Sequence, residues 1–112
     1  MLITVEDNCF SSEKAARKSL QEKWAFVMDI DFPALVNNPH WHSFDSCLYL
    51  VDGEVTVTDV EANKSVTAKK GSTINFPSRV VHFESTDGYK VVAGMSEKPA
   101  DLMKVNLDPD KL

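Results

Sequence analysis

The sequence has few cysteines and no long apolar run. Cys9 and Cys47 are its only cysteines and lie far apart, so in a reducing compartment we expect free thiols instead of a disulfide. No apolar run approaches the about 18 residues that a membrane span requires. The first seven residues include Glu6 and Asp7 and lack the basic start and apolar stretch of a secretory signal. We therefore expect a cytoplasmic protein.

Positive charge is also scarce. No basic stretch is longer than Lys69-Lys70, and the formal net charge is −5. Such a chain repels phosphate backbones, which argues against nucleic acid as a partner. With 43% hydrophobic and 26% charged residues, the 112-residue chain is typical of an ordinary globular protein and is long enough for one compact domain, residues 1–112.

Residues 11–23 have the pattern of a short amphipathic helix. Serines stand at the start, good helix formers follow, and Ala16, Leu20 and Trp24 are spaced four apart. The apolar stretch 24–30 predicts a buried strand, and residues 31–39, with two prolines and two asparagines, predict a loop.

The rest of the chain predicts a series of brief antiparallel strands. Apolar and polar residues alternate with period two around Val55 and Val57, as in a sheet with one buried face. Asp52-Gly53 and Asp87-Gly88 are dipeptides typical of hairpin turns. Regularly spaced short strands favour a sandwich or barrel, with its core at about residues 24–106, and residues 100–112 are expected to add a final strand before an acidic tail. The expected strands are 47–51, 54–60, 65–69, 73–76, 80–85 and 89–95.

The three histidines are the candidate metal ligands. On a strand, residues i and i+2 face the same way, so His40 and His42 are expected to point together. His82 would join them if its strand lies beside theirs, and neutral imidazole is a common ligand of transition metals. The alternative is that the first two are a polar pair at a loop-to-strand junction and that His82 is a buried core histidine.

Besides the three histidines, the chain has Gly53, Gly71 and Pro77 at set distances from them. These six residues are in register with the two sequence motifs of the cupin superfamily, which the region of about residues 39–86 resembles. The resemblance implies an all-β fold, the cupin or jelly-roll antiparallel β-barrel, here with a short N-terminal helix. It also implies one divalent transition metal, with Fe(II) favoured and Zn, Ni, Mn or Cu as alternatives.

Several positions depart from the cupin motifs. Ala34, Arg79 and Thr86 replace two glycines and an asparagine, and Ser46 stands in the place of the metal-binding glutamate. A hydroxyl is a poor ligand, so three neutral ligands are expected to hold the ion. Two other residues remain candidates for the fourth metal ligand. Asp45 would reach the ion only through a bulge, and Cys47 is more typical of a small buried apolar residue.

Three nitrogens on one side of an ion leave positions open for a substrate, as in catalytic sites. The resemblance then favours an Fe(II) dioxygenase acting on a small chelating anion. A non-catalytic metal-anchored binding protein and a cupin isomerase or lyase are the alternatives. Tyr89 is a candidate acid or hydrogen-bond donor, and a homodimer is expected. The expected pocket residues, most of which would equally suit a plain barrel core, are Phe26, Met28, Phe44, Ser46, Leu48, Phe76 and Arg79.

Overall fold

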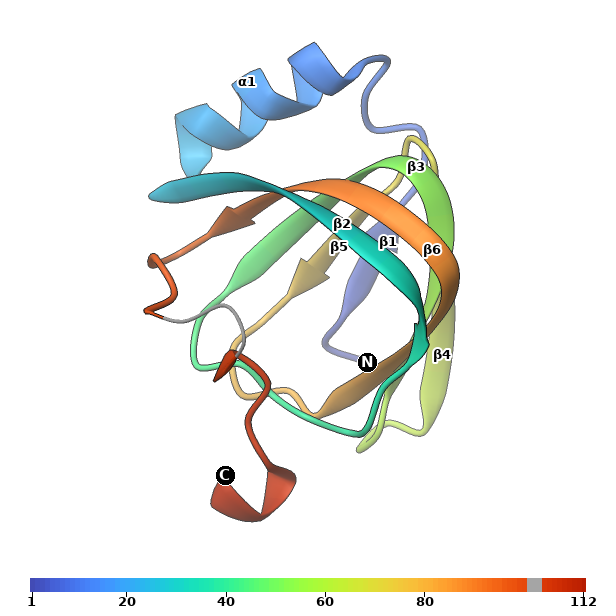
Figure 1. The fold of residues 1–112 in the computed structure, drawn as a ribbon, viewed down its shortest axis with the longest axis vertical. Coiled ribbons are helices and arrows are strands. Elements are labelled where there is room, and N and C mark those ends of the chain that lie inside the picture. The colour runs from blue at the N-terminus through green and yellow to red at the C-terminus, as the bar shows by residue number, and fades with distance from the viewer. Residues whose placement is uncertain (101–103) are drawn as a thin grey trace.

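The computed structural model describes residues 1–100 and 104–112. Within these residues one α-helix accompanies six strands, and a short 3-10 helix, η2, lies near the C-terminus (Figure 1). The elements are β1 (Thr4–Glu6), α1 (Glu13–Lys23), β2 (Phe26–Val36), β3 (Ser46–Asp59), β4 (Lys64–Lys69), β5 (Thr73–Phe76), β6 (His82–Met95) and η2 (Pro109–Lys111).

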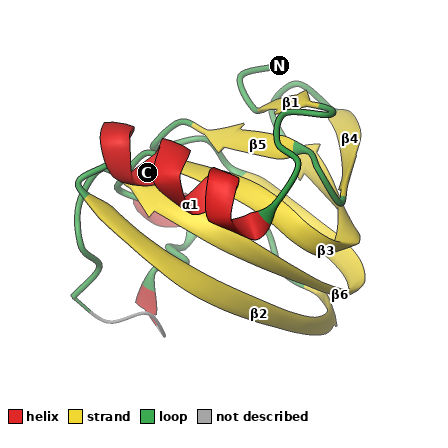
Figure 2. Ribbon diagram, turned by 90° about the horizontal axis from the view of Figure 1, so that it is seen from above, coloured by secondary structure: helices red, strands yellow, loops and turns green. Residues whose placement is uncertain are grey.

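The strands form one curved antiparallel sheet. Its order is β1-β5-β3-β6-β2, and β4 pairs with β3. Seen from above, the long strands curve around the interior while α1 lies across their outer side (Figure 2). The all-β class is confirmed, but the hydrogen-bonded order of the described strands ends at β1 and β2 and does not close into a complete barrel.

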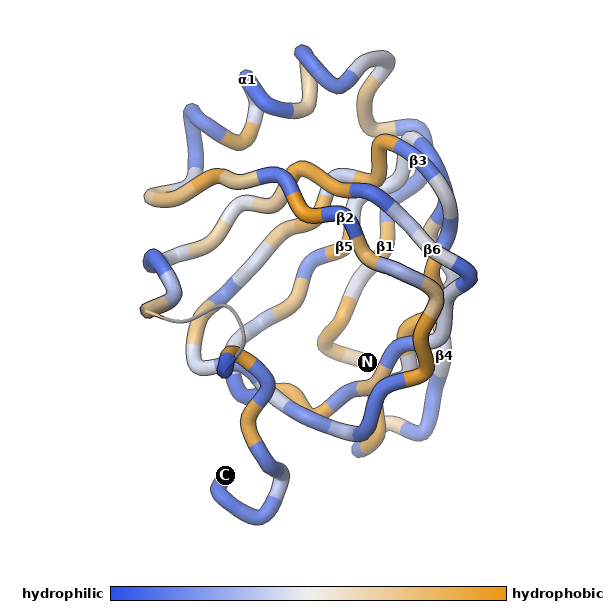
Figure 3. The backbone as a smooth tube through the Cα atoms, viewed as in Figure 1, coloured by the Kyte–Doolittle hydropathy of each residue, from blue (hydrophilic) through white to orange (hydrophobic). Residues whose placement is uncertain are grey.

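Apolar and polar residues alternate along much of the sheet (Figure 3), so most of each strand turns one face to the interior, whereas residues 46–48 of β3 and 91–95 of β6 are all buried. The main core cluster, which includes Leu50, Val57, Ile74 and Val91, fills the inside of the curve. A smaller cluster of Leu20, Cys47 and Val92 lies between the sheet and α1.

The predicted helix is confirmed. Ser12 is its N-cap, and its Oγ accepts a hydrogen bond from the Ala15 backbone N–H (3.1 Å). The side chains of Ala16 and Leu20 are buried, while most of the remaining helix surface is exposed. The spacing of four residues therefore selects the face that packs on the sheet.

We expect Ser12→Ala to lower the free energy of unfolding by about 1 kcal/mol, because the Ala15 N–H loses its partner at the helix start. Urea denaturation measures the loss. The matched control is Ser11→Ala, a neighbouring exposed serine outside the cap. Equal losses in the two variants would contradict the capping role.

The two hairpins predicted at Asp52-Gly53 and Asp87-Gly88 are wrong. Both dipeptides lie inside long strands, β3 and β6, which pair with each other, with Gly53 opposite Tyr89. The two glycines have positive φ (77° and 126°), and the register shifts on either side of Gly53. They bend a continuous strand pair around the core instead of ending it.

Strand β2 continues through the predicted loop to Val36. It carries Pro33 opposite Gly88, and it lies at one end of the strand order. Proline is tolerated on an edge strand, because the missing N–H leaves no neighbouring carbonyl unpaired. The three-residue strand β1 was not predicted from the sequence.

The final strand predicted within residues 100–112 lies partly outside the described residues. Its described part instead contains an isolated bridge between Trp41 and Leu107, followed by η2. No helix among the described residues is both long and apolar enough to cross a membrane. The homodimer stays a prediction that light scattering would test.

Candidate metal centre

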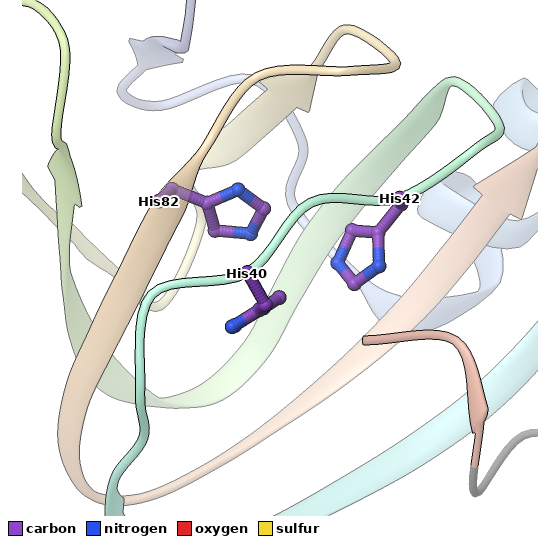
Figure 4. Close-up of side chains that lie close together, drawn as sticks. All are labelled: His40, His42 and His82. Atoms are coloured by element: carbon purple, nitrogen blue, oxygen red, sulfur yellow. The ribbon is translucent and has the colours of Figure 1, made fainter. Parts of the chain in front are cut away.

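The backbone places the three histidines side by side. His40 and His82 form an isolated antiparallel bridge, with reciprocal N–H to carbonyl hydrogen bonds of 2.9 Å. Their ring centroids lie 4.5 Å apart, and the ring of His42 lies 5.1 Å from each. Figure 4 shows the three side chains gathered from two segments of the chain that are distant in sequence.

Each imidazole is oriented by a backbone carbonyl. Nδ1 of His40 donates to the Asn38 carbonyl (2.7 Å), and Nδ1 of His82 donates to that of Val80 (2.8 Å). Nδ1 of His42 donates to the carbonyl of Val105, 63 residues away (2.8 Å). These bonds fix the tautomer, so Nε2 of each ring keeps its lone pair for a ligand.

The nitrogens are close enough to share an ion. One ligand atom from each histidine lies within 4.8 Å of the others. Zinc–nitrogen bonds of about 2.0–2.1 Å put two ligands of a tetrahedral ion about 3.4 Å apart, so modest side-chain rotations would complete the site. Nε2 of His82 is buried and has no hydrogen-bond partner in the described structure, and a metal would supply one.

Burial keeps the imidazoles neutral. It lowers the pKa of His40 and His42, and it lowers the pKa of His82 to about 4. Neutral imidazole is the form that coordinates metals, so the three rings are ready to bind at neutral pH.

The His82 pKa predicts an acid-sensitive fold. Between its ordinary value of 6.5 and about 4, the unfolded chain binds a proton at His82 that the folded protein does not. The free energy of unfolding of metal-free protein should therefore fall as the pH is lowered through this range, by up to about 3 kcal/mol. Urea denaturation from pH 7 to pH 4 measures it. The carboxylates titrate in the wild type and in His82→Gln alike, so the difference between their free energies of unfolding at each pH isolates the contribution of His82. Identical pH profiles of the two proteins would contradict the prediction.

A cavity of about 270 Å³ opens beside His40 and His42. Most of its walls are apolar, and they include residues of β2, β3 and β5 together with the C-terminal segment. Among the residues expected in the pocket, the structure places four in this lining: Phe44, Ser46, Leu48 and Phe76.

The other expected pocket residues lie outside that lining. Phe26 and Met28 are partly buried and pack against the main core. The guanidinium of Arg79 lies over the ring of Trp41, with its central carbon 5.6 Å from the ring centroid.

Sequence reasoning missed one carboxylate beside the histidines. Glu84 lines the cavity, and its Oε1 lies 4.0 Å from Nε2 of His82. The hydroxyl of Tyr89 donates to Glu84 Oε2 (2.9 Å), and the Tyr89 ring stacks on Phe32. Burial raises the pKa of both Glu84 and Tyr89. The available signal was the spacing, since Glu84 follows His82 by two residues and shares its face of the strand.

No protein-family model matches the sequence, and no curated protein matches it either. Solved structures do match. A DUF861 family protein from Thermotoga maritima is similar with a TM-score of 0.63 and 19% identity, over 83% of this chain and 98% of that one. A sugar 3,4-ketoisomerase from Thermoanaerobacterium thermosaccharolyticum, solved in complex with TDP, is similar with a TM-score of 0.66 and 13% identity, over 99% and 93% of the two chains. The chain has a cupin-like fold.

A further similar structure is that of the polyketide cyclase RemF from Streptomyces resistomycificus, with a TM-score of 0.54 and 17% identity over 70% of this chain and 62% of that one. All three identities are low, so the likeness shows the fold alone. The cupin-like arrangement nevertheless explains why segments near residues 40 and 82 meet, because β3, β5 and β6 carry them to the same side of the interior.

In this cupin-like fold the two alternative fourth ligands point elsewhere. Asp45 is exposed, and its Oδ1 accepts a hydrogen bond from the Ser78 backbone N–H (2.7 Å). Cys47 packs with Leu20 under α1, where burial raises its thiol pKa to about 12. Both cysteines are free thiols, as predicted. Ser46, which occupies the place of the cupin glutamate, lines the cavity.

Proposed function

We propose that this protein is a metal-dependent cupin-type enzyme that acts on a small molecule, with His40, His42 and His82 holding one divalent transition metal. One observation carries the proposal: three neutral imidazoles, each oriented by its own backbone carbonyl, converge beside an apolar cavity. Three protein nitrogens leave further coordination positions for a ligand, as in catalytic sites.

The favoured metal is Fe(II), and the favoured reaction is dioxygenation of a small chelating anion. A bound Fe(II) ion would supply redox chemistry and a positive charge that attracts the anion. The side chains from β2, β3 and β5 would hold the apolar body of the substrate and exclude water from the site. Support for this reaction comes from the histidine set and the resemblance to cupin motifs.

An isomerase is the second candidate. It is favoured by similar structures that match almost the whole chain, including a 3,4-ketoisomerase from Helicobacter canadensis and a TDP-quinovose 3,4-ketoisomerase from Campylobacter jejuni. An isomerase moves protons within its substrate and consumes no oxygen, so the two reactions are separable by experiment.

The test begins with metal analysis of freshly purified protein, followed by anaerobic reconstitution with Fe(II). Oxygen uptake is then measured with diketones, thiols and hydroxylated aromatic acids, using His40→Ala as the matched control. Uptake that requires His40 would support the dioxygenase.

The same protein preparations, incubated without oxygen with a TDP-linked ketosugar and followed by NMR, report isomerisation. Substrate rearrangement without oxygen uptake would favour the isomerase. Tight ligand binding without turnover in either assay would favour a metal-anchored binding protein. Failure of the wild type to bind any divalent transition metal would overturn the proposed function.

A further inference from the structure

A buried carboxylate lies at the histidine cluster without belonging to the cupin motif. The side chain of Glu84 is 9% exposed. Its Oε2 accepts a hydrogen bond from the hydroxyl of Tyr89 (2.9 Å), and its Oε1 lies 4.0 Å from Nε2 of His82, which has no hydrogen-bond partner within residues 1–100 and 104–112. One oxygen is thus held in place while the other faces a group that needs a partner.

We propose that Glu84 is the fourth, anionic ligand of the metal centre and that Tyr89 is its positioning residue. The proposal rests on the proposed function, because it assigns a ligand to the same metal. The carboxylate that the cupin motif would place at Ser46 on β3 is supplied here from β6, two residues after His82.

The distances permit shared coordination. A metal–nitrogen bond and a metal–oxygen bond are each about 2.0–2.2 Å long, so the two atoms lie about 3.4 Å apart on a tetrahedral ion. Glu84 Oε1 lies 4.0 Å from His82 Nε2, while the described groups whose ligand atoms all lie within 4.8 Å of one another are the three histidines, so Glu84 must move closer to His40 and His42 to share their ion. Rotation about the side-chain bonds of Glu84 would close the remaining gap.

The structure fixes Glu84 from several sides. Its backbone N–H donates to Asn37 Oδ1 (2.7 Å), and its carbonyl accepts from the Asn37 backbone N–H (3.1 Å). On the other side of β6, Glu84 pairs with Val57 of β3. Tyr89 is 3% exposed and follows the bend at Gly88, which lets its hydroxyl reach Glu84. Such support is typical of ligands whose orientation matters.

The charge of the site follows from this assignment. A divalent ion with three neutral imidazoles and one carboxylate keeps a single positive charge. A buried carboxylate is costly when its charge is uncompensated, and the ion would offset that cost. The centre should therefore prefer a singly charged anion, such as a monocarboxylate or an enolate, over a doubly charged one.

The test compares the metal affinity of Glu84→Gln with that of the wild type, using Zn(II) and Co(II) in competition with a chromophoric chelator. Glutamine keeps the size of the side chain and can still accept the Tyr89 hydrogen bond. We expect its affinity to fall at least roughly 100-fold, the upper end of the effect of losing an outer-shell partner. The matched control is Glu54→Gln, the same change at an exposed position of β3, which should keep wild-type affinity.

Two further readouts separate a ligand from a structural residue. The visible spectrum of the Co(II) protein reports ligand number and type, and it should change in Glu84→Gln but stay close to wild type in Tyr89→Phe. Tyr89→Phe should weaken metal binding by roughly 10-fold, because the carboxylate remains but is less well oriented. A purely structural Glu84 would instead lower the stability of metal-free protein and leave the Co(II) spectrum unchanged.

The outcomes distinguish this inference from the proposed function. Wild-type affinity and an unchanged Co(II) spectrum in Glu84→Gln would overturn the ligand assignment while leaving the three-histidine centre intact. Metal binding that does not depend on the histidines, or no binding by the wild type, would overturn both.

Discussion

His82→Ala and His40→Ala should each lose the bound metal. Each histidine supplies one nitrogen, and His82 is 2% exposed, so no solvent-exposed group can take its place without rearrangement of the core. Because outer-shell changes alone weaken metal sites by 10- to 100-fold, we expect the loss of a ligand to weaken binding by more than about 100-fold. Elemental analysis of protein after gel filtration measures the remaining metal.

Two further variants distinguish the loss of a metal ligand from a failure to fold. His82→Gln keeps a side chain of similar length at the buried position, and it should also lose the metal. Arg79→Asn changes a residue close to His82 in sequence, at a positive φ of 67° that asparagine tolerates. It should retain the metal, because Arg79 does not line the cavity. Stoichiometric metal in either alanine variant would contradict the three-histidine centre.

Gly53→Ala should destabilise the protein by about 4 kcal/mol or more. A Cβ at this position would lie 2.3 Å from the Gly88 carbonyl oxygen and 2.8 Å from the Tyr89 Cα, both of which are backbone atoms. The φ of +77° adds strain that an L side chain cannot avoid. Strain and overpacking each cost about 1–3 kcal/mol, and the backbone of the β3 and β6 pair cannot move aside cheaply. Chemical denaturation measures the loss.

Gly71→Ala is the matched control. Gly71 also has a positive φ, of +92°, but the nearest atom to its added Cβ is the Phe10 carbonyl oxygen at 4.0 Å. This variant carries the backbone strain without the steric clash, so it should lose only about 1–3 kcal/mol. Equal losses at the two positions would show that the close approach of β3 and β6 contributes nothing.

The sequence predicted those elements whose signals are local. The helical spacing of Ala16 and Leu20 and the serine before them identified α1, and strand β5 was predicted with its observed bounds. The hairpins predicted at Asp52-Gly53 and Asp87-Gly88 were wrong because they, too, were inferred from a local signal. A two-residue pattern cannot reveal that Gly53 lies opposite Tyr89 of β6 and Gly88 opposite Pro33 of β2, partners that are distant in the chain, where bending is needed instead of reversal.

The candidate site shows the same division. The His-x-His spacing and the third histidine were visible in the sequence, because the cupin motifs fix their positions. The motifs place the fourth ligand at the position of Ser46, which pointed to its neighbours Asp45 and Cys47 and away from Glu84. Its placement depends on the bridge between His40 and His82 and on the bend that brings Tyr89 to it, which are contacts between distant segments.

The carbonyl that orients His42 belongs to Val105 in the C-terminal segment. Trp41 holds the same segment through backbone pairing with Leu107 and through its indole N–H, which donates to the Asp108 carbonyl (2.8 Å). This C-terminal segment would therefore be thermodynamically linked to an ion bound at the histidines. Metal that binds the ordered His42 also favours the docked tail, and by the same linkage a docked tail tightens the metal. Proteolytic clipping near residue 105 would thus report metal occupancy, since a loaded centre holds the cleavage site against the body of the protein.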